Sequence, residues 1–380
     1  MLSIFSRLAI LSLLAASSIS CQQGITGNSA TKDELFITLP ATDSLVIVDP
    51  AQKKQTSRLK LGKLPHNIRL SANGKKLYVV LVGSQAIAEI DIASRELIRT
   101  FLTESVPIVD DVGLSIEPHV SQQADSHNSC FNCHNGRADG AKPAIVGSRP
   151  FGIALTEDNQ LLVANTLTAT VNYIDLDSGT IVKSLDIVAT GDAQEPTELA
   201  IIDDRLYVTV RPVLPSLSPS VLRVYGLRSG VLLSESPVGS AVTALEIDAS
   251  NALLYTTNFE SNTLDKFGPD GELIESFIVG DGPFGINQQG DSLLVANFYD
   301  NSISRINLLE KNVVTQKLQT AEQQFANPTH MNLSLDARRI YLISGGTNGF
   351  LLTLDSKTLE IVSDMQIDGL PFDIVNINKQ

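Results

Sequence analysis

A short phrase that begins with proline recurs along this 380-residue chain and constrains its fold more than any other feature. The copies are PHNIRLS at Pro65, PFGIALT at Pro150, PTELAII at Pro196, PFGINQQ at Pro283, PTHMNLS at Pro328 and PFDIVNI at Pro371, with AVTALEI at Ala241 filling the series. Most copies lie 42 to 46 residues apart, whereas 85 residues separate Pro65 from Pro150. Self-similarity at a fixed period of this length is typical of a repeat architecture.

Each phrase is followed by short segments rich in Val, Leu, Ile and Tyr, such as KKLYVVLV, SLLVANF and TVNYIDL, separated by polar turns such as LDSGTI and GPDGEL. These compositions favour strands. No segment has a sustained helical period. Four strands in a period of about 40–50 residues are typical of a β-propeller blade, so the sequence predicts an all-β protein.

The two ends of the repeat region complete one blade. Residues 34–64 contain three strands (ELFITLP, DSLVIVDP and TSRLKLG) and lack a first one, whereas PFDIVNI at the C-terminus is a first strand with nothing after it. Six further blades begin at residues 65, 150, 196, 241, 283 and 328. We therefore expect a seven-bladed propeller over 34–380, closed by pairing of the terminal strands, which removes two exposed edges.

The segments QLLVANTLTATVNYIDLDSGTIVKSL and PFGINQQGDSLLVANFYDNSISRINL resemble the repeats of YVTN-type propellers, such as YncE-like and lactonase-like seven-bladed proteins. The resemblance covers about residues 34–102 and 150–380. It implies the architecture, whereas the function has to be argued from the site because propellers support many chemistries.

The N-terminus has the plan of a secretory signal peptide, with Arg7 before a short apolar run and small residues after it. Residues 1–21 end in Ser-Ile-Ser-Cys, which resembles a bacterial lipoprotein processing site, although Ser18 stands where Leu is usual. We expect lipidation of Cys21, a flexible linker over 22–33 and a periplasmic, membrane-anchored protein without a spanning helix. Gln22 favours the outer membrane. The alternative is ordinary cleavage near Ala16–Ser20.

The chain is acidic, with 28 Lys and Arg against 42 Asp and Glu. A net charge of −14 argues against nucleic acid and against direct binding to an anionic membrane surface. The expected partners are the membrane, reached through the lipid anchor, and a redox protein or a small molecule.

The long gap between Pro65 and Pro150 contains Cys130-Phe-Asn-Cys133-His134. C-x-x-C-H is the attachment signature of c-type haem, because two thiols at this spacing reach both porphyrin vinyl groups and the next residue places an imidazole under the iron. One covalent haem c, with His134 as an iron ligand, is therefore predicted. The alternatives are a Cys130–Cys133 disulfide, or a zinc site that adds His119 and His127.

Residues 103–149, which surround this motif, lack blade-like strands and read as an insertion between blades two and three. The connections between blades and the loop at 211–220 should lie on the same face, so both elaborations should cover one mouth of the ring. Cys130 to Gly140 also resembles the haem segment of dihaem peroxidase-like cytochromes, although this chain has a single C-x-x-C-H. Within that segment, Arg137 is a candidate partner for a haem propionate.

The second axial ligand is predicted in the order His330, His119, His66, with an open site as a further option. His66 and His330 occupy proline phrases where other copies carry Phe or Gly, so both should line the mouth. The preferred function is electron transfer or a redox step at the propeller mouth. The alternatives are a binding or scaffold protein with a Cys130–Cys133 disulfide and, less favoured, a lactonase-like hydrolase for which no catalytic constellation is readable.

Overall fold

The computed structural model describes residues 32–103, 149–187, 194–212, 220–346 and 348–378. The chain divides into two compact units, Met1–Thr31 and Lys32–Gln380, and the described residues all belong to the second unit. The C-x-x-C-H motif and the predicted lipidation site lie outside the described residues.

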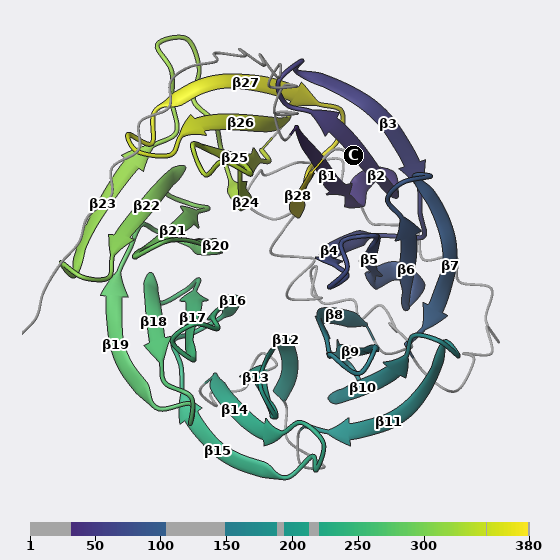
Figure 1. The fold of residues 1–380 in the computed structure, drawn as a ribbon. Helices are drawn as coiled ribbons and strands as arrows, with labels where there is room; N and C mark the ends of the chain where they lie inside the picture. Colours follow the sequence, from purple (N-terminus) through teal and green to yellow (C-terminus); the bar gives the residue numbers. More distant parts are fainter. Residues whose placement is uncertain (1–31, 104–148, 188–193, 213–219, 347, 379–380) are drawn as a thin grey trace, which may run out of the picture. The chain divides into compact units, whose positions relative to one another are not determined.

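Seven four-stranded antiparallel sheets make up the described part of the chain (Figure 1). Blade one contains β28 (Ile374–Asn378), β1 (Asp33–Leu39), β2 (Ser44–Asp49) and β3 (Lys54–Lys60). Blade two contains β4 (Pro65–Leu70), β5 (Lys76–Leu81), β6 (Ala86–Asp91) and β7 (Glu96–Leu102). Blade three contains β8 (Pro150–Leu155), β9 (Gln160–Asn165), β10 (Thr170–Asp175) and β11 (Thr180–Asp186).

The remaining blades repeat the same order. Blade four contains β12 (Gln194–Ile202), β13 (Arg205–Pro212), β14 (Val221–Gly226) and β15 (Leu232–Pro237), and blade five contains β16 (Val242–Asp248), β17 (Leu253–Asn258), β18 (Thr263–Phe267) and β19 (Leu273–Ile278). Blade six contains β20 (Pro283–Gln289), β21 (Ser292–Asn297), β22 (Ser302–Asn307) and β23 (Asn312–Lys317), and blade seven contains β24 (Pro328–Leu333), β25 (Arg339–Ser344), β26 (Gly349–Asp355) and β27 (Ile361–Ile367).

The helices of the described residues are two three-residue 3₁₀ turns, η1 (Pro40–Thr42) and η2 (Val82–Ser84). No helix among the described residues is long and apolar enough to cross a membrane. The predicted all-β, seven-bladed fold is confirmed.

Burial along the strands follows the layered structure of the ring. Every residue of β2 is buried, whereas residues of the outermost strand β3 alternate between exposed and partly buried. A middle strand is covered on both faces by neighbouring blades, and an outer strand has one face in water, so only the outer strand shows the alternating pattern.

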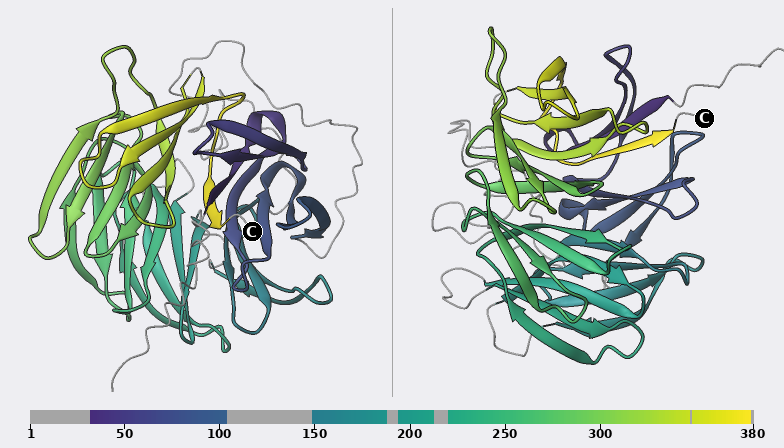
Figure 2. Two further views of the ribbon diagram at one scale, coloured as in Figure 1. Left: turned by 45° about the horizontal axis from the view of Figure 1, so that its top comes forward. Right: turned by 60° about the vertical axis from the view of Figure 1, so that its left-hand side comes forward.

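The ring closes by pairing of β1 with β28, as the sequence predicts. Their register joins Leu35 with Asn376 and Ile37 with Ile374, and the two strands lie side by side in Figures 1 and 2. Asp33 strengthens the junction because its carboxylate accepts hydrogen bonds from Tyr341 Oη at 2.8 Å and Asn376 Nδ2 at 2.6 Å. Closure therefore ties the N-terminal strand to blade seven as well as to the C-terminus.

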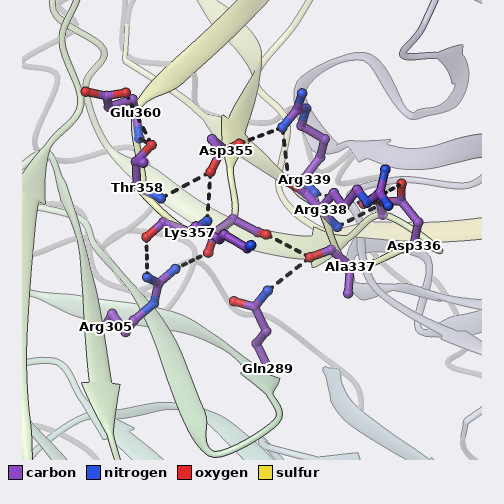
Figure 3. A network of polar contacts seen from close by, with 12 residues as sticks. Gln289, Arg305, Asp336, Ala337, Arg338, Arg339, Asp355, Lys357, Thr358 and Glu360 are labelled. Carbon is purple, nitrogen blue, oxygen red and sulfur yellow. Dashed lines mark hydrogen bonds and ion pairs between the residues drawn. The ribbon is translucent and has the colours of Figure 1, made fainter.

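Long side chains of one blade reach the turns of the next blade. Arg305 on β22 of blade six donates to the carbonyl oxygens of Ser356 and Lys357 in the turn after β26 of blade seven, the second at 2.7 Å (Figure 3). Gln289 donates from the end of β20 to the carbonyl of Ala337 at 3.0 Å. These bonds satisfy turn carbonyls that the blade's own ladder leaves unpaired.

Candidate functional site

The proline phrases begin the inner strands, which gather around the ring axis (Figure 1). The residue before the proline is left-handed in several copies, as at Leu64 with φ 53° and Asn327 with φ 54°. The register against the second strand then shifts between the proline and the residue three positions later, for example between Pro65 and Ile68. Such a bulge frees the two middle residues of the phrase from the ladder and re-aims their side chains.

Blade five corrects one detail of the sequence alignment. Ala241 has φ 56°, and Val242 pairs with Asn258 as Pro283 pairs with Asn297 in blade six. Val242 therefore takes the place of the proline, and the phrase begins one residue later than Ala241. The absence of proline removed the marker that aligned the other copies.

His66 lies inside the mouth of the ring and is only 2% exposed. Its imidazole stacks on Phe372 with ring centroids 3.8 Å apart and packs against the edge of Phe151 at 5.7 Å. Burial, followed by the charges of Arg149 and His330, lowers the pKa of His66 to about 3. The ring is therefore neutral at physiological pH, which is the form that binds metals.

His330 lies next to His66 but is only partly buried. Its Nδ1 lies 2.6 Å from the carbonyl oxygen of Phe372. A carbonyl only accepts, so Nδ1 carries the hydrogen, and when the ring is neutral the lone pair is on Nε2. This hydrogen bond fixes the tautomer and the orientation, as backbone carbonyls do for metal-binding histidines when they accept from the ring nitrogen that does not bind the metal.

Aromatic rings surround both histidines. We call His66, Phe151, Phe284, His330 and Phe372 the mouth cluster. Phe284 from blade six meets Phe372 from blade one at a centroid distance of 6.0 Å, and His330 from blade seven lies within 5.3 Å of both rings. The cluster thus joins side chains of five blades into one apolar surface.

The apolar surface continues beyond the mouth cluster. Phe284 contacts Phe259 at 6.1 Å and Phe298 at 5.9 Å, and Phe259 contacts Tyr299 at 4.9 Å. Such offset and edge-to-face pairs contribute about 0.5–1.5 kcal/mol each beyond the area they bury. The mouth is consequently lined by a continuous layer of aromatic rings.

Several charged side chains lie along the ring axis. They are close in the sequence to residues of the mouth cluster; Asp373, for example, follows Phe372. Arg69 on β4 extends between Glu198 on β12, with a closest approach of 3.9 Å, and Asp373, at 4.0 Å. Asp373 also accepts the backbone N–H of Ile68 at 2.8 Å. Glu246 on β16 acts electrostatically on the same arginine. We call Glu198, Glu246 and Asp373 the axial carboxylates.

The chain on either side of the segment 104–148 is fixed to blade three. Asn172 Nδ2 donates to the carbonyl of Thr103 at 2.8 Å, and the backbone N–H and hydroxyl of Thr166 both donate to the carbonyl of Arg149, at 3.1 and 3.0 Å. Thr103 and Arg149 are both buried. Arg149 is two residues from Phe151, so the described chain after this segment begins beside the mouth cluster.

The structure brings together two of the predicted site residues, His66 and His330. The other predicted residues lie outside the described part of the chain: Cys21, His119, Cys130, Cys133, His134 and Arg137. Within the described residues, no group of three or more His, Cys, Asp or Glu side chains could hold a metal ion. His66 and His330 would therefore need a further ligand to bind one.

Sequence reasoning missed Arg69, Glu198 and Glu246. Their signal was a charged residue inside an otherwise apolar inner strand, as in PHNIRLS and PTELAII. The sequence also assigned no role to Phe372, whose ring stacks on His66 and whose carbonyl orients His330.

The fold and the site define a seven-bladed β-propeller with an aromatic, histidine-bearing mouth. Solved structures with a similar fold include dihydro-heme d1 dehydrogenase NirN in complex with DHE, which is 12% identical over 91% of this chain and 75% of that chain, with a TM-score of 0.57. A streptogramin B lyase is 13% identical over 81% of this chain and 86% of that one, with a TM-score of 0.57.

The virginiamycin B lyase of Staphylococcus aureus, in a catalytically inactive form with quinupristin, is 14% identical over 82% of this chain and 88% of that one, again with a TM-score of 0.57. At these identities the likeness shows the fold alone. The chain matches no known family of protein sequences and no curated protein.

Proposed function

We propose that this chain is an exported redox protein that carries one c-type haem, attached through Cys130 and Cys133 with His134 as the proximal iron ligand. The haem would lie against the mouth cluster. When bound, haem c supplies reversible uptake of one electron. The chain's own residues would hold it, orient its second ligand and exclude water from one side.

The observation that carries the proposal is the environment of His330. Its Nδ1 is hydrogen-bonded to the Phe372 carbonyl, and its ring contacts both Phe284 and Phe372. Among the described residues Nε2 has no hydrogen-bond partner. An oriented imidazole among aromatic rings would suit His330 as the protein's second ligand to haem iron.

Two further observations agree with this interpretation. The described chain after the C-x-x-C-H segment begins at Arg149, which is close enough to His66 to lower its pKa. A protein of similar fold, NirN, is by its name a dihydro-heme d1 dehydrogenase, which agrees with haem chemistry on this fold. Arg137 remains the candidate partner for a propionate.

A haem stain of the denatured, full-length protein tests attachment. After expression with haem-attachment machinery, we expect a stained band that is lost in Cys130→Ser/Cys133→Ser. An unstained wild-type band would refute the proposal. It would favour the binding or scaffold protein with a Cys130–Cys133 disulfide, which thiol labelling before and after reduction would detect.

Optical spectra of single variants test the second ligand. We expect His330→Ala to weaken the low-spin bands most, with His119→Ala and His66→Ala next in order. His127→Ala is the control, because its position three residues before Cys130 makes ligation from the opposite face awkward. If none of the three variants changes the low-spin bands, the ligand lies elsewhere.

Export and anchoring form part of the same proposal. The signal-like segment ending in Cys21 would place the propeller in the periplasm on a lipid tether, with the outer membrane favoured. Cys21→Ser should move the protein from the membrane fraction to the soluble fraction. A wild-type protein already soluble after cell disruption would contradict the anchor.

A further inference from the structure

The axial carboxylates form an unbalanced charge group. Glu198, Glu246 and Asp373 act on one guanidinium, that of Arg69. Arg211 also acts on Glu198, but it forms a closer ion pair with Glu195 at 2.9 Å. Ion pairs of 3.9 and 4.0 Å lie at the outer limit of such contacts, so Arg69 offsets only part of the negative charge.

Glu198 and Asn67 are a buried pair inside this group. Each of the two residues is 3% exposed, and Asn67 Nδ2 donates to Glu198 Oε1 at 3.3 Å. Asn67 Oδ1 is also buried and has no hydrogen-bond partner among the described residues. A buried acceptor without a partner costs about 1–3 kcal/mol, so this amide is not fully satisfied while the carboxylate is ionised.

One proton on Glu198 would supply the hydrogen-bond donor that Asn67 Oδ1 lacks. A neutral Glu198 has an O–H donor, and rotation of the Asn67 amide by half a turn presents Oδ1 in place of Nδ2 to that donor. The amide oxygen and nitrogen have nearly the same size, so the same two side-chain positions serve both protonation states. Asn67 is therefore suited to bind either form of the acid.

The backbone is built to bring this pair together. Asn67 belongs to blade two and Glu198 to blade four, and blade three lies between them. In blade three the corresponding residue is Gly152, where a Cβ would lie 2.3 Å from the Thr197 carbonyl oxygen and 2.8 Å from Glu198 Cα. Only glycine permits this close approach of β8 to β12.

We propose that the Asn67–Glu198 pair is a proton-binding site, and that its occupancy is coupled to the redox site at the mouth. The coupling half of this inference rests on the proposed function. A one-electron reductant would reduce the haem iron of the proposed function, and the Glu198 carboxylate would take one proton from hydronium, with one O–H bond broken in hydronium and one formed in Glu198. Oxidation releases the electron and the proton, so the net charge of the region is unchanged.

The chain connects the two sites directly. Asn67 follows His66, and Asp373 follows Phe372, whose carbonyl orients His330. Three charged groups act on Glu198, namely Arg69 from β4, Asp373 beside β28 and Arg211 from β13. Strand β8 presents only the uncharged Gly152 and Ala154. Glu246 on β16 affects Glu198 through their shared neighbour Arg69. Burial raises the pKa of Glu198 to about 7, which places its titration in the physiological range.

Infrared spectra of the full-length protein as a function of pH test proton binding without reference to haem. The pKa of Glu246 is also raised to about 7, mainly by burial. In the wild type we therefore expect two protonated-carboxyl bands that titrate near neutral pH. Glu198→Gln and Glu246→Gln should each retain one of these bands, and the double variant should have none. Glu96→Gln, on the exposed start of β7, is the matched control and should retain both.

Loss of the Glu198 band is the decisive result. If the spectra of wild type and Glu198→Gln have the same titrating bands, the proton-binding site is refuted. In Asn67→Ala, which lacks the amide, the Glu198 titration should move. An unchanged titration would show that Asn67 has no part in proton binding.

Redox titration tests the coupling. One proton per electron gives a midpoint potential that falls by about 59 mV per pH unit around neutral pH, since that is a tenfold change for a one-electron couple. Glu198→Gln should flatten this slope, and Glu96→Gln should keep it. A haem-bearing wild type with a flat potential refutes the coupling. A chain without haem refutes both the coupling and the proposed function, whereas the infrared result still decides the proton site.

Discussion

Replacing His66 by Phe should make the protein less sensitive to acid. Phenylalanine is the residue that three other copies of the phrase carry at this position, namely Phe151, Phe284 and Phe372, so the local packing accepts an aromatic ring there. His66 is buried against Phe372, and its pKa is lowered from 6.5 to about 3. At acid pH the imidazole binds a proton in the unfolded state but not in the folded state, so acid lowers the free energy of unfolding.

The lowered pKa fixes the sign and the approximate size of the effect. The stability contributed by a depressed pKa is present above 6.5 and is lost as the pH falls from 6.5 towards 3. At about pH 5 the loss is roughly 2 kcal/mol, because each pKa unit corresponds to about 1.4 kcal/mol. Glu198 and Glu246 act in the opposite sense, since their raised pKa values contribute stability that is lost as the pH rises through about 7.

Urea unfolding at about pH 5 and about pH 7.5 measures this term. The carboxylate contributions are common to both proteins, so they cancel when wild type and His66→Phe are compared at each pH. His66→Gln separates titration from packing, because it removes the titrating group without restoring the aromatic contact. If the stability difference between wild type and His66→Phe changes by less than about 0.5 kcal/mol between the two pH values, the buried neutral histidine is refuted.

Two further changes test the architecture. Deleting 371–380 removes three buried apolar side chains worth about 1.5–3 kcal/mol each, a large part of a typical total of about 5–15 kcal/mol, so aggregation or a much lower melting temperature is expected and an unchanged melt would contradict closure by β28. Gly152→Ala places a Cβ 2.3 Å from the Thr197 carbonyl oxygen and should lower the free energy of unfolding in urea by about 1–3 kcal/mol. Gly345→Ala is the control, because the nearest atom to its Cβ is 3.6 Å away, and it should lower the free energy of unfolding much less. Equal losses of stability in the two variants would refute the close approach.

Much of the fold could be predicted because the repeat carries its own markers. Proline has no backbone N–H for the ladder, so it is confined to strand starts and bulges and marks the same position in each copy. Where proline is absent, in blade five, the alignment was wrong by one residue. Closure was predictable because the unpaired strands at the two ends complement each other, and β1 indeed pairs with β28.

The site was only partly predictable, because it is assembled from residues far apart in the chain. The phrase places His66 and His330 on inner strands, and the structure brings them close enough for His330 to act on the pKa of His66. It could not show that His66 would be stacked on a ring or that His330 would be oriented by a backbone carbonyl. Phe372 supplies both the ring and the carbonyl, and it lies at the opposite end of the chain from His66. The haem ligands predicted in the insertion lie outside the described residues and stay predictions.

The two glycine-bearing phrases suggest how a propeller of near-identical blades acquires a site. Gly152 precedes the blade that carries Glu198, and Gly285 precedes the blade that carries His330. A Cβ at Gly285 would lie 2.3 Å from the Thr329 carbonyl oxygen and 2.9 Å from His330 Cα, which is nearly the contact pattern of Gly152 with Thr197 and Glu198.

In both places a glycine in one blade allows the inner strand of the next blade to pack closely against it. That inner strand carries a polar side chain, Glu198 or His330, at a position where other copies have glycine or a smaller residue. The repeat thus uses one backbone arrangement twice, once for a buried acid and once for an oriented imidazole. Propellers support many chemistries, so the function of this one has to come from the residues that depart from the repeat. The departures at Glu198 and His330 share a common backbone cause, which is why we expect the proton site and the redox site to work as one unit.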